Sequence, residues 1–409
     1  MATSVTGPSR RKTRGIVLDL IRAARTISRV ELAVNAGLTA PTITQITREL
    51  MADGLVVEVG RGASTGGKPP TLLRLNAQAR YSVGVQLERN TSVVVVVDLA
   101  GRPVARSSFQ GTALMPPDQA LPQVASHVEA LLNTAEVDRD KVLGVGLVSY
   151  GPQDRQAGVL MSPQPTDDWL DYPIARRLAE ILRLPVLLDN DAAAAAIGEY
   201  WMGAIGPGHT YGCIYMASGI GGGIVVDGEV YRGSASNTAE IGHISLDVNG
   251  GECGCGNRGC VENLAGPWAV ISNAAATPGL AQRLGLGMDP ANTDILTDFA
   301  RIAQAASEGD ATARTLIEQS AQYLGSAAVT MANLFDLDLI VLAGPSFAVA
   351  GAIYQSVIQA EVDRRTFARQ AHSVRVIRSA NGSDAAAVGG AVLVLQNELT
   401  LLGARQAYS

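Results

Sequence analysis

Two stretches of this chain share one pattern of strands and turns, and this near-repeat limits the possible folds more than any other feature. Residues 82–104 and residues 211–232 each read as a strand, a tight turn, an apolar strand, and an Asp before a turn into another strand. Residues 146–152 and 340–345 match as well, since both are apolar strands that end in Gly-Pro. Each half also carries a long helix pattern, at about 118–135 and about 311–336. The sequence therefore predicts a duplicated α/β body of two lobes with a cleft between them.

The composition argues against a disordered chain and against a membrane protein. Of the 409 residues, 47% are apolar and 17% are charged, which supplies enough apolar surface for a packed core. No apolar run approaches the roughly 20 residues that a membrane helix needs, and the first apolar stretch is interrupted by Asp19 and Arg22. We therefore expect a cytoplasmic protein without a secretion signal or a membrane partner.

Charge divides the chain into two parts of opposite sign. Residues 1–80 hold 12 Lys/Arg against 5 Asp/Glu, whereas the remaining residues hold 20 against 33, so the net charge of −6 conceals a basic head and an acidic body. A basic segment is typical of a module that binds a polyanion. We expect a head at 1–78 and a body at 79–409. Within the body, we expect a first lobe at about 79–200 plus the C-terminal helix, and a second lobe at about 201–383.

The basic head has the pattern of a helix–turn–helix. Apolar spacing predicts a first helix at about 11–25. Ser28 and Glu31 match a capping box at the start of a short second helix, and Thr39 caps a third helix that ends near Ala52. Two helices joined by a short turn that contains glycine are typical of DNA-binding proteins. The alternative is a packing or dimerisation module whose charge is only solvated.

Two strands follow the third helix, at 55–59 and 71–75, and they bracket a basic, glycine-rich tip. Such a hairpin is typical of a wing that contacts the DNA backbone or the minor groove. Polar side chains on the third helix suit the major groove. The residues that we expect to contact operator DNA are Thr42, Thr44, Gln45, Thr47, Arg48, Arg61 and Lys68. We also expect this head to fold around a small core of its own.

One histidine and three cysteines lie close together in the sequence of the body, at His243, Cys253, Cys255 and Cys260. One imidazole and three thiolates form a closed tetrahedral zinc set, and the glycines among these residues allow the chain to wrap around an ion. Because this set leaves no coordination position open, we expect a structural zinc ion rather than a catalytic one. The alternative is a group of free, buried thiols.

Two further segments carry polar groups that suit a ligand. A strand delivers Asn190 and Asp191 to the start of a helix, where a carboxylate can accept a proton from a sugar hydroxyl. Alternatively, Asp191 only caps this helix. The glycine-rich run 218–223 exposes backbone N–H groups that suit phosphate, but it is equally a tight hairpin turn.

On these motifs, the chain resembles the ROK family of repressors, open reading frames and sugar kinases. The resemblance rests on the cysteine run 253–262, the Glu-x-Gly-His before it, the Asn-Asp pair after a strand and the Ser-Gly-Ile-Gly-Gly-Gly turn, and it covers residues 81 to about 400. It implies an actin-like, hexokinase-type fold of two α/β lobes with a sugar between them. The basic head resembles the repressor branch of the family, whose members are commonly homodimers or homotetramers.

The resemblance also implies a set of sugar-binding residues. The residues that would hydrogen-bond sugar hydroxyls are Gly158, Asn190, Asp191, Glu240, His243 and Glu262, with His243 also on zinc. Asp191 falls at the position where the kinases of the family keep their catalytic base. Gln164 stands where the family often has Asn at a sugar contact, which leaves the identity of the sugar open.

The phosphate-binding motif of the family's kinases is altered in this chain. The kinases begin the body with Asp-x-Gly-Gly-Thr-Lys, whereas this chain has Gln86 to Thr91 in its place, without the Asp and without either glycine. Glu88 adds negative charge and bulk where ATP phosphates would have to approach. The later nucleotide motif has Ala343 and Pro345 where the kinases favour glycine. We therefore expect that the chain is not an enzyme.

Together, these patterns predict a sugar-responsive transcriptional regulator, most simply a repressor of genes for carbohydrate uptake or catabolism. Its expected partners are double-stranded operator DNA and an unphosphorylated mono- or small oligosaccharide. One alternative is a sugar kinase with a DNA-binding head, which the presence of Asp191 supports. Another is a regulator that responds to a phosphorylated sugar or to a partner protein.

Overall fold

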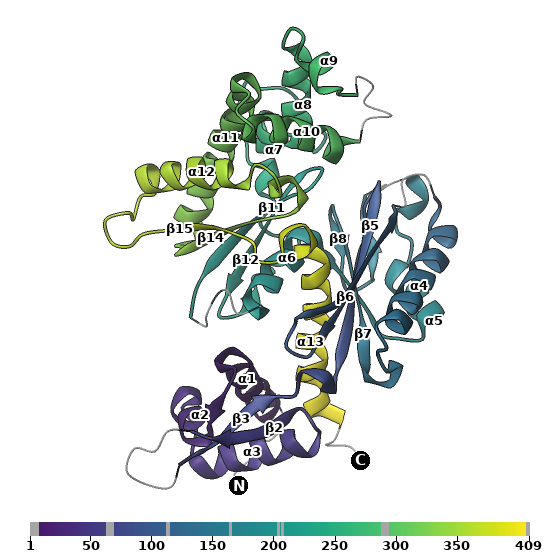
Figure 1. Cartoon of the computed structure of the whole chain (residues 1–409), viewed down its shortest axis with the longest axis vertical. Helices are drawn as coiled ribbons and strands as arrows, with labels where there is room; N and C mark the ends of the chain where they lie inside the picture. The colour runs from purple at the N-terminus through teal and green to yellow at the C-terminus, as the bar shows by residue number, and fades with distance from the viewer. Residues whose placement is uncertain are drawn as a thin grey trace.

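The computed structural model describes residues 8–62, 69–111, 115–162, 166–202, 205, 208–287 and 294–405. Figure 1 shows a small N-terminal head, two larger α/β lobes, and a long helix, α13 (Ala385–Arg405), that runs from between the lobes toward the head. Lys68, expected in the wing, and Gln164 lie outside the described residues. None of the helices in these ranges is long and apolar enough to cross a bilayer.

The head, as far as it is described, combines three helices with a small antiparallel sheet, as predicted for a winged helix–turn–helix. Its elements are α1 (Pro8–Ala24), β1 (Ile27–Ser28), α2 (Arg29–Ala36), α3 (Ala40–Ala52), β2 (Val56–Arg61) and β3 (Thr71–Leu75), and β3 is the central strand. The capping box is confirmed, because the Ser28 hydroxyl accepts the Glu31 N–H while the Glu31 carboxylate accepts the Ser28 N–H. Gly37 has a left-handed φ of 61°, which lets the chain turn sharply between α2 and α3.

The first lobe contains a five-stranded mixed sheet with helices on both faces. Its strands, in spatial order, are β10 (Val186–Asn190), β7 (Val142–Ser149), β4 (Tyr81–Gln86), β5 (Thr91–Asp98) and β6 (Pro103–Gln110). Helices α4 (Pro117–Thr134) and α5 (Ile174–Leu182) pack on one face, and α13 packs on the other. A short hairpin of β8 (Gln153–Asp154) and β9 (Val159–Leu160) follows β7.

The second lobe repeats this topology. Its strands, in spatial order, are β13 (Glu229–Val230), β12 (Ile220–Val226), β11 (Tyr211–Met216), β14 (Leu339–Ala343) and β15 (Arg375–Arg378). In both sheets the first strand in the chain pairs antiparallel with the second and parallel with the fourth. The remaining helices of this lobe are α7 (Val261–Ala265), α8 (Pro267–Ala276), α9 (Leu280–Leu284), α10 (Ile295–Ser307), α11 (Ala311–Phe335) and α12 (Gly351–Arg365). The predicted duplication of an α/β unit is therefore confirmed.

Two helices, α6 (Asp191–Trp201) and α13, pack against each other between the sheets (Figure 1). Helix α6 contacts β11 and β12 of the second lobe, whereas α13 contacts β4, β5 and β7 of the first. Every residue of α6 is buried. The two backbones approach so closely that a Cβ on Gly389 would lie only 1.7 Å from the carbonyl oxygen of Ala194. Glycine and alanine at this crossing are therefore required to bring the two lobes together.

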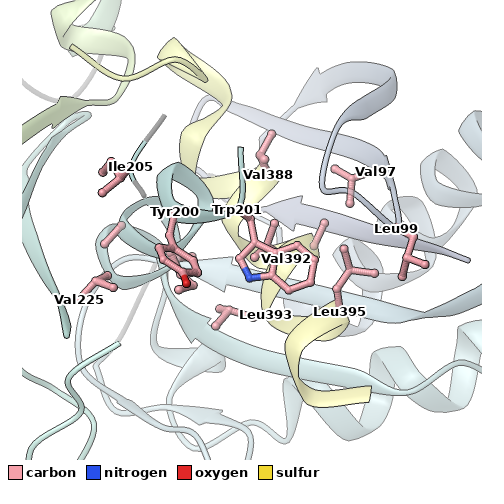
Figure 2. Packing of buried hydrophobic residues seen from close by; sticks show 14 of the residues in the cluster. Val97, Leu99, Tyr200, Trp201, Ile205, Val225, Val388, Val392, Leu393 and Leu395 are labelled. Carbon is pink, nitrogen blue, oxygen red and sulfur yellow. The ribbon is translucent and has the colours of Figure 1, made fainter. Parts of the chain in front are cut away.

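The head shares its core with the body, so the expectation of a separate small core is wrong. Helix α1 contacts α2, α3 and β3 within the head, and it also contacts α13 of the body. Leu32, Ile43 and Leu50 of the head consequently belong to the same apolar cluster as Trp201 of α6 and Val392 of α13. Figure 2 shows the α6–α13 part of this cluster. The physical reason is that α1 buries apolar side chains both against the rest of the head and against α13 of the body. The cores of head and body are therefore continuous through α1.

Candidate functional site

The predicted metal ligands form one cluster in the second lobe. The donor atoms of His243, Cys253, Cys255 and Cys260 all lie within 4.8 Å of one another. Cys253 Sγ lies 3.7 Å from His243 Nδ1, and Cys255 Sγ lies 3.8 Å from Cys260 Sγ. Two thiolates on one tetrahedral zinc ion are about 3.8 Å apart, because each Zn–S bond measures about 2.3 Å. The donor set and its spacing therefore fit a single tetrahedral metal ion better than a group of unrelated thiols.

Local hydrogen bonds hold the loop in the shape that brings these donors together. The carbonyl of Asn257 accepts the Cys253 N–H at 2.8 Å, and its side-chain amide donates to the carbonyl of His243 at 3.3 Å. Gly259 has a left-handed φ of 57°, and a Cβ there would lie 1.9 Å from the carbonyl oxygen of Asp247. A larger residue at this position would push the loop open, so the cysteine spacing depends on this glycine.

Glu262 connects the metal loop to the glycine-rich hairpin of the second sheet. Its Oε2 accepts the Ile220 N–H at 2.9 Å, and a Cβ on Gly219 would lie 2.7 Å from the same oxygen. Strands β11 and β12 pair on either side of this turn. The run 218–223 is therefore the end of a hairpin turn and the start of β12, and a carboxylate already accepts one of the N–H groups that a phosphate would need.

Asn190 and Asp191 stand at the start of α6 and have different roles there. Asn190 Oδ1 accepts the N–H groups of Ala192 and Ala193 at 3.0 and 3.1 Å, which makes Asn190 the N-cap. Asp191 Oδ1 also accepts the Ala192 N–H, but its side chain is buried inside the protein. Burial, with a further contribution from the charge of Glu240, raises the pKa of Asp191 to about 7. Asp191 is therefore a buried carboxyl that changes charge near neutral pH.

Three other expected sugar contacts gather near Asp191. Burial raises the pKa of Glu240, the charge of Glu262 raises it further, and His243 lowers it. Since Glu240 in turn raises the pKa of Asp191, these four side chains share one polar region beside the start of α6. We refer to this region as the interlobe site. Its composition suits a polyhydroxylated ligand, because carboxylates accept hydrogen bonds from hydroxyl groups.

Gly158 lies in the β8–β9 hairpin of the first lobe. Its φ is 70°, its carbonyl accepts the Ala175 N–H of α5, and a Cβ would lie 2.8 Å from the side chain of Ala175. The hairpin is joined to the second lobe, since the Gln153 N–H donates to Asn237 Oδ1 at 3.0 Å. These bonds explain the glycine by packing, and its contact with a sugar stays a prediction.

Glu88, considered in the sequence only as an obstacle to ATP, is a second buried carboxyl beside the interlobe site. It is 8% exposed, and burial followed by the charge of Asp191 raises its pKa to about 8. Gln86 Nε2 donates to Glu88 Oε1 at 3.1 Å and to the Tyr215 hydroxyl oxygen at 2.8 Å. The end of β4 therefore carries a hydrogen-bonded set of large polar side chains instead of a glycine turn.

Sequence reasoning did not single out Asp189, which is the centre of a buried ion-pair network. Both of its carboxylate oxygens accept hydrogen bonds from Arg232 at 2.7 Å, and Arg155 Nη2 lies 3.0 Å from Oδ2. Arg232 follows β13 in the second lobe, whereas Arg155 lies in the β8–β9 hairpin of the first, so the network joins the lobes next to Asn190. A strand ending in Asp-Asn-Asp was a usable signal, because a buried Asp requires a cationic or hydrogen-bonded partner.

The candidate DNA-contact residues of the head are mostly accessible. Helix α3 begins at its N-cap Thr39, and Pro41 stands in the first turn. The exposed residues among the predicted contacts are Thr44, Gln45, Arg48 and Arg61, and Thr42 is partly exposed. The polar face of α3 and one wing residue are thus free to meet DNA phosphates and base edges, as far as the structure describes the wing.

Thr47 was wrongly assigned to this polar face. Its side chain is 0% exposed, its hydroxyl accepts a hydrogen bond from Arg29 Nε at 3.2 Å, and it donates to the carbonyl of Thr44 at 3.2 Å. Arg29 also pairs with Glu58 of β2. Thr47 therefore packs at the contact of α2, α3 and β2, and it cannot reach a base.

Comparison with known protein families decides the classification of the body. A sequence model described as "ROK family" matches residues 82–397, which is most of the two-lobed body. The chain belongs to the ROK family. A second model, described as "Winged helix-turn-helix DNA-binding", matches residues 10–57 of the head.

Relatives of this ROK protein include both a regulator and a kinase. A putative xylose repressor from Caldicellulosiruptor sp. (strain Rt8B.4) is 30% identical, over 94% of this chain and 95% of that protein. A ROK family transcriptional regulator homologous to the E. coli MLC protein has the same fold, with a TM-score of 0.74, 24% identity, and coverage of 97% of this chain and 99% of that one. A ROK glucokinase from Streptomyces griseus, solved with glucose and AMPPNP, has a TM-score of 0.63 and 27% identity, over 76% of this chain and 98% of the glucokinase. Family membership alone therefore does not separate the two functions.

Proposed function

We propose that this ROK protein is a sugar-responsive transcriptional repressor that acts as a homodimer or homotetramer. Its effector is an unphosphorylated mono- or small oligosaccharide that binds at the interlobe site, and its target is an operator that controls carbohydrate genes. The similarity to a putative xylose repressor, over 94% of this chain and 95% of that protein, supports this proposal. The observation that carries it is structural: the helix that begins at the interlobe site ends in contact with the DNA-binding head.

Helix α6 makes this connection directly. It begins at Asp191, and over 11 residues it extends about 16 Å to Trp201. There the carbonyl of Trp201 accepts a hydrogen bond from Arg22 Nη1 of α1 at 2.5 Å. The Arg22 guanidinium also lies 4.7 Å from the centre of the Trp201 ring and 5.2 Å from that of Tyr200. A cation at the C-terminal end of a helix and over two aromatic rings is electrostatically favourable.

A second set of bonds strengthens the same joint. The Tyr200 hydroxyl donates to Asp19 at 2.8 Å, and Asp19 accepts a further hydrogen bond from Arg22 Nε at 2.9 Å. About two turns earlier in α1, Arg14 forms an ion pair with Asp53 at the end of α3. A movement at the start of α6 would therefore be passed through α1 to the recognition helix. Sugar binding can change operator affinity only if two conformations of the protein bind sugar differently, and this connection is the route by which such a change would reach the head.

The metal cluster supports the sugar site from one side. His243, Cys253, Cys255 and Cys260 would hold a zinc ion, which when bound would cross-link the loop and fix the imidazole of His243. The chain's own residues do the recognition: Glu240 and Glu262 accept hydrogen bonds from sugar hydroxyls, and Asn190 offers its amide N–H groups. Asp191, when it is ionised, accepts a hydrogen bond from a sugar hydroxyl.

The kinase alternative has one specific observation in its favour. Asp191 has a pKa of about 7, which suits a general base. Against it stand Glu88 and Gln86 at the end of β4, whose large hydrogen-bonded side chains replace the glycines of the kinase motif. Glu88, with a pKa raised to about 8, also repels ATP phosphates at a pH where it is ionised. A coupled assay of ATP turnover across monosaccharides separates the two: turnover that Asp191→Asn abolishes would establish the kinase.

The repressor is tested by measuring operator affinity with and without sugars. An operator is first selected from a random duplex pool with the full-length protein. We expect one sugar to weaken the complex by about 10-fold or more, a size typical of allosteric coupling. Asp191→Asn should bind the operator normally and lose the response to sugar. If no sugar alters a confirmed operator complex, the proposal is wrong.

A further inference from the structure

A cavity of about 430 Å³ lies at the junction of the head and the body. Arg22 and Arg25 come from the end of α1, Arg74 comes from β3, and Arg102 comes from the turn between β5 and β6. Residues 76–78, which connect the head to the body, form the rest of the wall together with Leu75 and Ala100. The volume falls within the range of about 300–1,000 Å³ that is usual for small-molecule sites.

The lining of this cavity is strongly cationic. It includes four arginines and no Asp or Glu. Within the described part of the chain, Arg25, Arg74 and Arg102 are exposed, and no carboxylate lies within ion-pair distance of them. Asp19 forms an ion pair with Arg22, and the carboxylate of Asp98 in β5 accepts the backbone N–H of Arg102 and feels the charge of its side chain. Arg25, Arg74 and Arg102 therefore carry positive charge that no ion pair compensates within the described residues.

One of the four arginines is held in place. The Arg22 side chain is 5% exposed and is fixed by Asp19, the Trp201 carbonyl and two aromatic rings. Arg25 is the residue after α1, and its left-handed φ of 61° ends that helix beside the cavity. The side chains of Arg25, Arg74 and Arg102 are exposed and are therefore available to a ligand.

The connection between the domains is also fixed on both sides of the cavity. The Asn76 N–H donates to the carbonyl of Leu55 in the head, and the Leu99 N–H of the body donates to the carbonyl of Ala77. A ligand in this cavity would therefore contact the head, the connection and the body at the same time.

From this geometry we infer that the junction cavity binds a small molecule that carries a phosphate group. Arginine is suited to phosphate because its planar guanidinium donates two parallel hydrogen bonds to an oxyanion. A DNA phosphate is the less suitable occupant. Helix α3 faces away from the body in Figure 1, whereas Arg102 and the adjacent Ala100 belong to the body. The site is separate from the interlobe site, and it gives the protein a second input, which meets the proposed sugar response at Arg22.

Calorimetry on the full-length protein tests this site with two probes, inorganic phosphate and glucose 6-phosphate, and with free glucose as a reference. We expect at least one phosphate-bearing probe to bind, and Arg74→Gln and Arg102→Gln each to weaken its binding at least 10-fold. Arg375→Gln removes an exposed arginine of β15 and should leave binding unchanged. Asp191→Asn alters the interlobe site and should leave it unchanged as well, which separates this site from the sugar site. Comparable affinity for both probes identifies free phosphate, whereas preference for glucose 6-phosphate identifies a phosphorylated metabolite.

Three results would overturn the inference. The first is that neither phosphate probe binds the wild-type protein at millimolar concentration. The second is that Arg375→Gln or Asp191→Asn weakens binding as much as the junction variants do. The third is that Arg74→Gln and Arg102→Gln, without any probe, each lower the salt dependence of operator binding by the equivalent of one phosphate contact, since both arginines would then contact DNA. Thermal unfolding of each variant verifies that it is folded.

Discussion

At the residue scale, the interlobe site is defined by carboxyl groups that are costly to ionise. Burial is the largest cause of the raised pKa of Glu88, about 8, and of Asp191, about 7, and each carboxyl lies in a region that holds other acids. A bound sugar would replace water at these groups with hydroxyl donors, which favour the charged form of Asp191. The charge states of Glu88 and Asp191 can therefore be tested by measuring how the variants depend on pH.

Replacing Glu88 should stabilise the fold at higher pH. The pKa of Glu88 is raised from 4.5 to about 8 in the folded protein, so between these values the folded chain holds a proton that the unfolded chain has released. Stability therefore falls as pH rises through this window. In Glu88→Gln this loss is absent, and its free energy of unfolding should gain on the wild type by about 1.4 kcal/mol per pH unit at most. Urea unfolding at pH 5.5, 6.5 and 7.5 measures this difference.

An exposed glutamate provides the control for this experiment. Glu229 of β13 is exposed, and Glu229→Gln should keep a constant difference from the wild type over the same pH range. A difference for Glu88→Gln that does not change with pH would contradict the raised pKa of Glu88.

Removing one thiolate should separate the metal from DNA binding. In Cys255→Ser the set of four donors is incomplete, so bound zinc should fall from one equivalent to well below half, and the sugar response should be lost with it. Operator binding without sugar should persist, because the metal loop lies in the second lobe and the head is held by α1, α6 and α13. Metal analysis and operator titration of the same sample measure both effects.

Cys213 offers a matched cysteine outside the cluster. It is a buried residue of β11, and Cys213→Ala should keep the metal content of the wild type. Metal content that is unchanged in Cys255→Ser would refute the site.

At the element scale, three helices connect the interlobe site to the polar face of α3 that we propose binds DNA. Helix α6 is buried along its whole length and cannot shift without moving what it touches. The C-terminal end of α6 contacts α1 through Arg22, and α3 contacts α1 through the ion pair of Arg14 and Asp53. In the proposed mechanism, a movement of α6 therefore reaches the exposed face of α3 through α1.

Arg22→Met should uncouple the sugar site from operator binding. The variant keeps most of the apolar stem of Arg22 and loses the guanidinium that contacts the Trp201 carbonyl and the rings of Trp201 and Tyr200. We expect a loss of about 1–2 kcal/mol in stability and a sugar effect on operator affinity reduced at least about 5-fold. Tyr200→Phe removes only the hydroxyl bond to Asp19 and should have a smaller effect. A full sugar response in Arg22→Met would show that the signal travels by another route.

Arg48→Gln tests the face of α3. Arg48 is exposed on this helix, and the loss of one phosphate contact should weaken operator binding and reduce the slope of log K against log salt by about 1. Thr47→Ser keeps the buried hydroxyl that Arg29 contacts, so it should leave both the affinity and the slope unchanged. A larger effect of Thr47→Ser than of Arg48→Gln would restore the original assignment of Thr47 to the DNA surface.

At the scale of the whole molecule, the two lobes depend on a crossing of two helices with very small side chains. The α6–α13 contact brings backbones together at Gly389 and Ala194, and the same pair of helices packs on both sheets. A larger side chain at the crossing would push the two lobes apart, because the interior has no free volume to accept it.

Gly389→Ala should therefore destabilise the whole molecule. The added Cβ would lie 1.7 Å from the Ala194 carbonyl oxygen, and relief of this overlap should cost about 3 kcal/mol or more. Gly15→Ala in α1 is a suitable control, since a Cβ there meets nothing within 4 Å and alanine favours a helix by about 1 kcal/mol over glycine. Denaturant unfolding compares the two, and equal stability of both variants would contradict the close crossing.

Much of this organisation could be predicted from the sequence because its signals are local. The near-repeat predicted the strands at 82–104 and 211–232 and the matching later strands at 146–152 and 340–345, since apolar runs and turn residues act within a few positions of one another. The capping box at Ser28 and Glu31, and the convergence of His243 with three cysteines, follow from short spacings and simple chemistry in the same way.

Only the tertiary structure decided what depends on contacts between distant segments. Thr47 is buried because Arg29 of another helix reaches it, and Asp189 is paired by arginines from both lobes. The head lacks a separate core because α1 has apolar neighbours on the head and on α13. The junction cavity joins arginines from three elements far apart in the chain. A pattern in sequence determines which face of an element is apolar, but which neighbour covers that face is set by the packing of the whole chain.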